Sequence, residues 1–197
     1  MKITGGVLVI LILIAGCVSN QVSETSELVS QLRQGGYVIF FRHGSTDHSQ
    51  KDIDKKNLAN CETQRRLDDR GRQQAKLIGD GFKKMGIPVG DAITSYYCRC
   101  INTAKIAFGK ATPSMDITSI QGVPLDVRQQ RISNLRKMLN TPPKPGTNTV
   151  LVAHQWMFKD AAGHQLSEGE AAIFKPRPNA FAAQYIRRVK PVEWKDL

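Results

Sequence analysis

The chain has 197 residues, 41% of them hydrophobic, and a formal net charge of +11 at pH 7. This length fits one domain that buries a single substantial core. A basic excess usually indicates nucleic acid, an anionic membrane surface or an anionic ligand as partner, although a solvated basic surface accounts for it equally well.

The N-terminus has the features of an export signal. Lys2 precedes the apolar run GGVLVILILIAGC, which is shorter than the roughly 20 apolar residues that a membrane-spanning helix needs. Residues 14–17, Ile-Ala-Gly-Cys, resemble the bacterial lipobox, in which the cysteine carries lipid and becomes the mature N-terminus. A plain signal peptide with a chance cysteine is the alternative. The predicted organisation is a lipoprotein signal peptide over residues 1–16, a lipidated Cys17 with a polar tether over residues 17–27, and one domain over residues 28–197.

Export narrows the expected location and partners. A protein outside the cytoplasm rarely meets nucleic acid, so we expect no nucleic-acid partner, contact with a membrane through the lipid anchor, and a monomer. In lipoproteins of bacteria with two membranes, Asp after the lipidated cysteine commonly favours retention at the inner membrane. Val18 occupies that position here, which favours the periplasmic face of the outer membrane where the bacterium has one.

The following residues alternate between helical and strand patterns. Residues 26–36 have apolar positions at helical spacing and end in two glycines, and the apolar run 37–41 is typical of a strand buried on both faces. The polar residues 44–66 predict a long loop, either functional or disordered. Residues 67–86 form the next predicted helix, which begins at an aspartate cap and ends at Gly86.

The same alternation continues to the C-terminus. The predicted elements are strands at 91–97 and 149–154, a short strand near 115–119, and helices at 100–109, 125–140 and 155–163. Two late strands, within 169–176 and 180–189, are expected to form an antiparallel pair at a sheet edge.

This order of elements predicts an α/β fold, a three-layer sandwich with a mostly parallel central sheet flanked by helices. Such sheets bind ligands beyond the carboxyl ends of their strands. Three predicted strands end there in Arg42-His43, in the Cys98-Arg99 region and in His154. Each residue alone is compatible with a surface cation or a loop histidine, but their convergence predicts a site.

Three cysteines remain beside Cys17. An oxidising compartment would allow one disulfide and leave one thiol. Cys98 and Cys100 are too close in sequence for a relaxed bridge, so we expect Cys61 to pair with one of them and favour Cys98. No Cys-x-x-Cys motif occurs and the four histidines are scattered, so we expect no zinc site.

The residues at the strand ends suit a phosphate group. Arginine binds phosphate oxygens bidentately, and a neutral imidazole can attack phosphorus. Arg42-His43-Gly44 after an apolar strand resembles the signature of the histidine phosphatase superfamily, which includes cofactor-dependent phosphoglycerate mutases and acid phosphatases. Further segments are similar to the family in the same order: LDDRGRQQAKLIG, ITSYYCRCINTAKIAFG with Arg99, and VLVAH with His154.

The resemblance covers roughly residues 37–190 and implies a phosphoglycerate mutase-like fold. It implies that His43 is the nucleophile that becomes phosphorylated and that Arg42 and Arg99 clamp the phosphate oxygens. His154, protonated when phosphate is bound, would donate a hydrogen bond to the same group. No metal or cofactor is implied, because arginines and histidines supply the positive charge.

Other positions extend the predicted site. Gly44 would let the backbone pass close to the pocket, and Arg65 is either a solvated cation or part of the anion-binding surface. The segment GEAAIFKP resembles a subgroup of small exported members, including those associated with lipopolysaccharide-sugar phosphates.

The family also needs an acid that protonates the leaving oxygen. Some branches place it directly after the second histidine, where this chain has Gln155, and others between the second arginine and the second histidine. The predicted candidates are Asp126 and Glu170, while Asp47, Asp52, Asp116 and Glu168 remain open. Asp126 also suits a helix-capping role.

The sequence therefore predicts a phosphatase that hydrolyses phosphate monoesters through a phosphohistidine on His43, with phosphorylated small molecules, and envelope phosphosugars among them, as substrates. The alternative, motivated by Gln155, is a non-catalytic phospho-ligand or envelope-binding protein with a degenerate pocket. A phosphoglycerate mutase is less consistent with export, since its substrates are cytosolic.

Overall fold

The computed structural model of the chain describes residues 26–197. The signal peptide, Cys17 and most of the predicted tether lie outside the described residues. Within residues 26–197, no helix combines the length and the apolar character that crossing a membrane requires.

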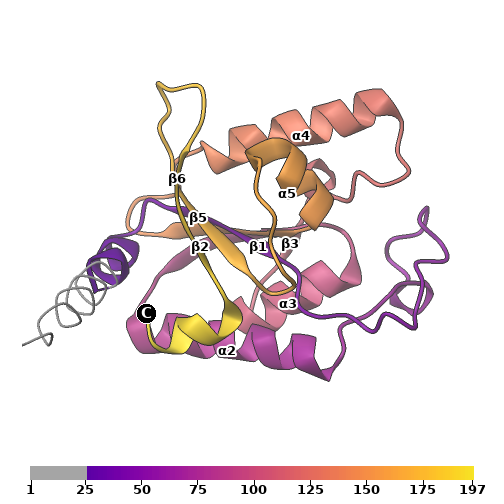
Figure 1. Cartoon of the computed structure of the whole chain (residues 1–197), viewed down its shortest axis with the longest axis horizontal. Helices are drawn as coiled ribbons and strands as arrows, with labels where there is room; N and C mark the ends of the chain where they lie inside the picture. The colour runs from indigo at the N-terminus through magenta and orange to yellow at the C-terminus, as the bar shows by residue number, and fades with distance from the viewer. Residues whose placement is uncertain (1–25) are drawn as a thin grey trace, which may run out of the picture.

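A six-stranded sheet forms the centre of the fold (Figure 1). Its strands are β1 (Val38–Arg42), β2 (Val89–Thr94), β3 (Thr112–Pro113), β4 (Asn148–Ala153), β5 (Ala171–Lys175) and β6 (Gln184–Val189). In the order β3-β2-β4-β1-β5-β6, neighbours pair in parallel up to β1, and β5 pairs antiparallel with both β1 and β6. The predicted mostly parallel sheet with a late antiparallel pair is confirmed.

Helices cover both faces of this sheet. They are α2 (Asp69–Met85), α3 (Cys98–Phe108), α4 (Leu125–Leu139) and α5 (Gln155–Ala162), together with the 3₁₀ helices η1 (Cys61–Thr63), η2 (Met115–Ile117) and η3 (Pro191–Lys195). Residues 26–34 are also helical. Figure 1 shows α2 and α3 below the sheet and α4 and α5 above it, which confirms the predicted three-layer sandwich.

The apolar run of β1 explains why the sheet is buried on both sides. Side chains alternate along a strand, so Ile39 and Phe41 pack into the core cluster under α2 and α3, whereas Val38 and Phe40 pack into the cluster under α4 and α5. All four are almost fully buried, and Phe40 stacks on Phe158 of α5 with ring centroids 4.4 Å apart. β1 is thus fixed from both faces, and so is the residue that follows it.

Two segments differ from the sequence prediction. The strand expected near 115–119 is the 3₁₀ helix η2, because the Ser114 side chain accepts a hydrogen bond from the Asp116 amide and turns the chain; the short strand β3 precedes it. The C-terminal η3 was not predicted. Its Trp194 is fully buried against α2, where Gly81 leaves no side chain in the way of the Trp194 carbonyl.

Candidate active site

The strand ends that were predicted to meet lie next to each other in the sheet. His43 follows β1 and His154 follows β4, and these strands pair in parallel with Arg42 opposite Ala153. The amide of His43 donates to the carbonyl of Ala153 at 3.1 Å, and the two imidazole rings lie 5.5 Å apart. Arg99 lies in the first turn of α3, which follows β2 on the other side of β4. The structure therefore brings together the two histidines and Arg99.

His43 is oriented for attack through one nitrogen. Its Nδ1 lies 2.9 Å from the carbonyl oxygen of Gly44, an acceptor, so Nδ1 carries the proton and Nε2 keeps its lone pair. The ring is 3% exposed. Burial lowers the pKa of His43 well below its ordinary value, and the nearby charge of Arg99 lowers it further, so the neutral form dominates at neutral pH.

His154 is held by a different set of groups. Its Nε2 lies 2.8 Å from the hydroxyl of Ser95, and the ring meets the edge of Tyr97 with centroids 5.1 Å apart. The buried thiol of Cys100 lies 3.7 Å from the same nitrogen. Burial, followed by the charge of Arg99, lowers the pKa of His154, whereas burial raises the pKa of the Cys100 thiol to about 12, so that this thiol stays protonated. Ser95 and Tyr97 were not predicted, although both lie in the segment that carries Arg99.

Arg99 is a buried cation with one fixed partner. Its residue is 4% exposed, its guanidinium lies 4.3 Å from the ring centre of Tyr97, and its Nη1 donates to Asp52 Oδ1 at 2.9 Å. The stacking and the ion pair hold the guanidinium in one plane.

Arg42 approaches the pocket from the opposite side. Its Nη1 donates to the carbonyl of Leu166 at 3.0 Å, and its Nη2 lies 3.3 Å from Glu168 Oε1. Arg65, on the loop after β1, contacts His48 Nδ1 through Nη1 at 3.2 Å. The charge of Arg65 contributes to the lowered pKa of His43 and of His154, which places this third arginine within electrostatic reach of both rings.

The three arginines share an unused donor. The Nε atoms of Arg42, Arg65 and Arg99 are all buried without a hydrogen-bond partner among residues 26–197. Buried donors in folded proteins are rarely left unpaired, so three in one pocket indicate a site for an oxyanion. Arg65 shares this feature with Arg42 and Arg99, which favours a part in an anion-binding surface over a solvated cation.

Gly44 is required by packing against a helix. A Cβ on Gly44 would lie 2.7 Å from the carbonyl oxygen of Gly71 in α2, and its amide donates to Thr103 Oγ1 at 3.1 Å. The close backbone approach that was predicted for Gly44 is therefore made to α2. This contact fixes the carbonyl that orients His43.

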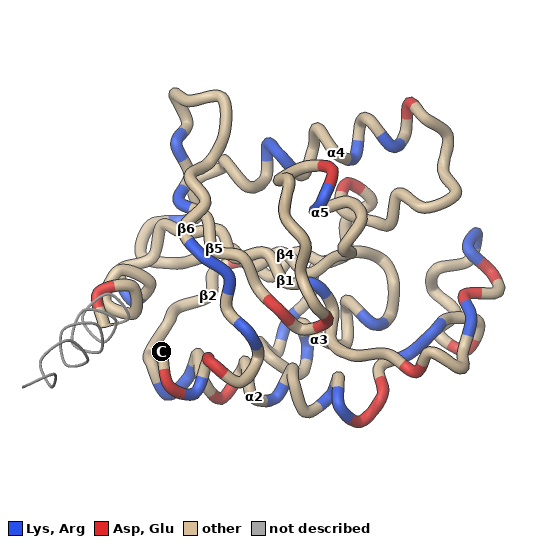
Figure 2. Tube along the Cα trace, in the orientation of Figure 1, with Lys and Arg blue, Asp and Glu red and all other residues tan. Residues whose placement is uncertain are grey.

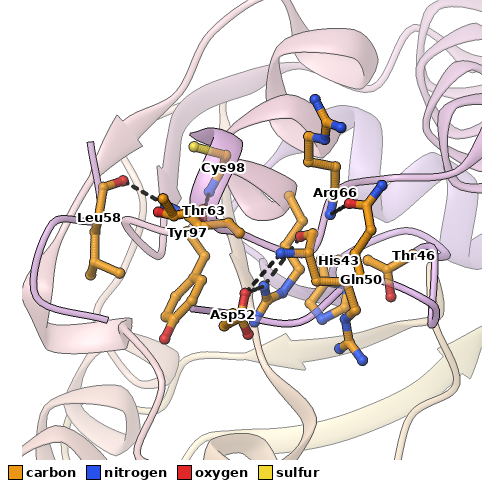
Figure 3. A network of polar contacts seen from close by, with 12 residues as sticks. His43, Thr46, Gln50, Asp52, Leu58, Thr63, Arg66, Tyr97 and Cys98 are labelled. Atoms are coloured by element: carbon orange, nitrogen blue, oxygen red, sulfur yellow. Dashed lines mark hydrogen bonds and ion pairs between the residues drawn. The ribbon is translucent and has the colours of Figure 1, made fainter. Parts of the chain in front are cut away.

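The long loop after the signature is ordered and tied to α3. The disulfide Cys61–Cys98 is present, as favoured from the sequence, and joins η1 to the residue before Arg99. Gln64 accepts a hydrogen bond from the Cys98 amide at 2.9 Å, and the amide of Arg65 donates to Asp52 Oδ1 at 3.0 Å. Figure 3 shows this network, with dashed lines joining Asp52 to its donors. Loop and helix together form one wall of the pocket.

Among residues 26–197, neither predicted acid has its carboxylate in contact with a pocket arginine, although the Glu170 carbonyl accepts a hydrogen bond from the Arg42 amide at 3.0 Å. Asp126 is exposed in the first turn of α4, where a carboxylate favours the helix dipole. The Glu170 carboxylate accepts a hydrogen bond from the Ser167 amide at 2.8 Å and faces Arg188 at 3.8 Å, so that it shapes the loop after α5. The carboxylates that contact pocket arginines belong to Asp52 and Glu168, two of the alternatives left open.

Gln155, at the position of the missing acid, has a structural contact. Its Oε1 accepts a hydrogen bond from the Leu166 amide at 2.7 Å. It thereby fixes the same loop whose Leu166 carbonyl holds Arg42. Among the described residues, no group of three or more His, Cys, Asp or Glu side chains is placed to hold a metal ion.

Comparison with solved structures defines the class of the fold. The protein histidine phosphatase SixA complexed with tungstate matches at 12% identity with a TM-score of 0.53, over 79% of this chain and 97% of that one. YhfR of Bacillus stearothermophilus matches at 14% identity with a TM-score of 0.59, over 80% and 99%. TTHB049 of Thermus thermophilus matches at 15% identity with a TM-score of 0.53, over 78% and 99%. These likenesses establish a phosphoglycerate mutase-like α/β fold.

Comparison of sequences finds a match to a family model. The profile of the histidine phosphatase superfamily (branch 1) matches residues 38–122, which contain Arg42, His43 and Arg99. No curated protein matches the chain significantly. The profile match and the fold confirm the resemblance predicted from the sequence.

Proposed function

We propose that the protein is a phosphatase that hydrolyses phosphate monoesters through a covalent phosphohistidine on His43. The observation that supports this most is the pairing of a neutral imidazole, whose Nε2 has a free lone pair, with three arginines whose buried Nε donors lack a partner. The first group is a nucleophile and the second binds an oxyanion. The family match and the tungstate complex of the SixA relative support the same reading.

The reaction has two steps. In the first, His43 Nε2 attacks phosphorus, the bond from phosphorus to the ester oxygen breaks, and the alcohol leaves. Arg42, Arg65 and Arg99 stabilise the charge on the equatorial oxygens. The phosphate dianion raises the pKa of His154, since an opposite charge favours the imidazolium, and the protonated ring donates to the transferring group. In the second step, water attacks the phosphohistidine and releases phosphate.

Loss of the nucleophile tests the proposal. The purified protein is incubated with 4-nitrophenyl phosphate, whose leaving group needs little protonation. His43→Ala should lower the rate by roughly three orders of magnitude or more, because nucleophile and base act as one unit. The control is His164→Ala, which removes a ring that stacks on Tyr185 after α5 and should leave the rate unchanged. Equal rates for wild type and His43→Ala would exclude His43 as nucleophile.

The second candidate is a non-catalytic protein that binds phosphorylated ligands, favoured by Gln155 in place of an acid. Both proteins should show a higher thermal midpoint with tungstate. A phosphatase should in addition form an acid-labile phosphate adduct that is absent from His43→Ala. Binding without turnover or adduct would identify the second candidate.

We further propose that the protein acts outside the cytoplasm, held to a membrane by lipid on Cys17, and that envelope phosphosugars are among its substrates. The lipobox-like residues 14–17 support the anchor, and the disulfide Cys61–Cys98 suits an oxidising compartment. A panel of phosphosugars and other phosphate monoesters tests the substrate, with kcat/KM for phosphosugars expected to exceed that for glycerol phosphates.

A further inference from the structure

The groups around the pocket form a connected polar network. Glu168 lies against Arg42 at 3.3 Å, His48 lies between Glu168 at 3.6 Å and Arg65 at 3.2 Å, and Asp52 accepts from the Arg99 guanidinium and from the backbone amide of Arg65. The Glu168 and Asp52 carboxylates therefore occupy Arg42 and Arg99 in the free protein. A phosphate that binds the same arginines must replace these contacts at least in part.

Asp52 is fixed by two donors. One oxygen accepts hydrogen bonds both from the buried Arg99 and from the backbone amide of Arg65. The amide contact belongs to the disulfide-linked loop and does not involve the Arg65 side chain. Asp52 is accordingly a positioning residue for Arg99.

Glu168 is held by weaker groups than Asp52 is. Its Oε1 accepts from the Thr46 hydroxyl at 3.0 Å and lies near the half-buried Arg42, and its Oε2 faces His48 at 3.6 Å, longer than a hydrogen bond. No backbone amide donates to it within residues 26–197. A hydroxyl can donate or accept, so Thr46 accommodates either the carboxylate or the acid.

A phosphate that takes Arg42 replaces the ion pair of Arg42 with Glu168 and lies beside that carboxyl group. His48 lies next to the same carboxyl group. Arg65 Nη1 donates to its Nδ1, which leaves the proton on Nε2, facing Glu168, and the side chain is 66% exposed to solvent.

We propose that Glu168 is the proton donor for the leaving group, in place of the acid that Gln155 cannot supply. This inference rests on the proposed function. As the bond from phosphorus to the ester oxygen breaks, the Glu168 carboxyl proton moves to that oxygen and the alcohol leaves. In the second step the Glu168 carboxylate takes a proton from the attacking water, the bond from nitrogen to phosphorus breaks, and phosphate departs. Atoms and charge balance over the two steps.

Leaving groups of different basicity test the assignment. The purified protein hydrolyses 2,4-dinitrophenyl phosphate, whose leaving group needs no acid, and an alkyl phosphate such as glycerol 2-phosphate, whose leaving group does. Glu168→Gln should slow alcohol release in the first turnover of the alkyl ester by about 10²–10⁴-fold, the usual contribution of a general acid, and leave the first-turnover release of 2,4-dinitrophenolate nearly unchanged. The basic limb of the pH profile for the alkyl ester should also disappear. Glu168→Asp should restore part of the alkyl rate.

Two controls separate the outcomes. Asp80→Asn, which removes a carboxylate from an exposed ion pair on α2, should change neither rate. An equal loss on both esters in Glu168→Gln would show that Glu168 only positions Arg42. No loss on either ester would show that Glu168 takes no part in the reaction. Each of these two results overturns the inference while the proposed function stands. If His43→Ala matches wild type on both esters, the proposed function itself fails.

Discussion

His43 and His154 lie in a pocket that buries both rings and surrounds them with cations. Neither ring has a carboxylate among its hydrogen-bond partners within the described residues; the partners are the Gly44 carbonyl for His43, and the Ser95 hydroxyl and the Cys100 thiol for His154. Burial and Arg99 both disfavour the imidazolium, so the resting pocket holds neutral rings beside three guanidinium groups. The positive charge resides on groups that cannot lose it, and the nucleophile stays unprotonated.

The titration of these rings is the first prediction. A histidine with the ordinary pKa of about 6.5 is mostly protonated at pH 6, whereas His43 and His154 should remain neutral there. The unfolded chain takes up these protons below about pH 6.5 and the folded chain does not, so the free energy of unfolding should fall as the pH drops through that range. Imidazole NMR spectra of the labelled protein measure the first effect and urea unfolding the second.

Arg99→Gln is the matched variant for this prediction. It removes the largest charge that acts on both rings, so their titration midpoints should rise towards the ordinary value. Midpoints at or above about 6.5 in the wild type would contradict the electrostatic account.

The four central residues could be predicted because each is defined by its place in the chain. Arg42, His43 and His154 follow apolar strands directly, and parallel strands bring their carboxyl ends to one edge. Glu168 could not be singled out in this way, because it reaches Arg42 from a loop 126 positions later and depends on how that loop folds over β1. Asp126 had a helix-start position that suited a capping role, but in the structure Pro124 is the N-cap of α4, no side chain caps the helix, and Asp126 lies in its first turn.

At the scale of elements, the pocket is made by loops that two contacts hold in place. The loop after β1 is joined to α3 by a disulfide, and its first residues pass against α2 where Gly44 meets Gly71. The length and polarity of residues 44–66 predicted a loop, and the cysteine spacing favoured its bridge. The internal order of the loop, which includes η1, depends on hydrogen bonds such as Gln64 to Cys98 that no local pattern reveals.

The disulfide is predicted to support both stability and binding. Replacing Cys61 and Cys98 with serine should lower the free energy of unfolding by about 2–5 kcal/mol. It should also weaken tungstate binding, because the loop carries Arg65 and the Asp52 that holds Arg99. Urea unfolding and calorimetric titration measure the two effects. Dithiothreitol should weaken tungstate binding to the wild type and leave binding to the double variant unaffected. If dithiothreitol changes the tungstate affinity of neither protein, hydrogen bonds alone hold the loop.

The crossing of the loop and α2 gives a further prediction. A Cβ on Gly71 would lie 2.0 Å from the carbonyl oxygen of Ser45, so Gly71→Ala must displace backbone that directly follows His43-Gly44. The expected cost is about 1–3 kcal/mol of stability, together with a lower kcat, since the Gly44 carbonyl orients His43. Arg70→Ala, exposed in the same turn, should change neither quantity by much. A fully active, stable Gly71→Ala protein would show that the loop adjusts freely.

At the scale of the whole molecule, charge is distributed in two ways. Figure 2 shows Lys and Arg spread over several elements, including α2, α4 and β6, as expected for a solvated basic surface. The pocket arginines differ, because Arg99 is buried and its Nε donor, like those of Arg42 and Arg65, has no partner in the described part of the chain. The net charge of +11 therefore could not distinguish a general basic surface from an anion site. The positions of the individual arginines make that distinction.

The last prediction concerns where the whole molecule is held. The lipobox-like residues 14–17 imply that Cys17 becomes the lipidated N-terminus, so labelled palmitate supplied to a bacterial host should enter the wild type and be absent from Cys17→Ser. The wild type should sediment with membranes, because lipid on one terminal cysteine adds apolar chains that a soluble domain lacks. Its kcat/KM should equal that of the variant, since the pocket lies within residues 42–168. Label retained by Cys17→Ser, or absent from the wild type, would contradict the anchor while leaving the chemistry at His43 untouched.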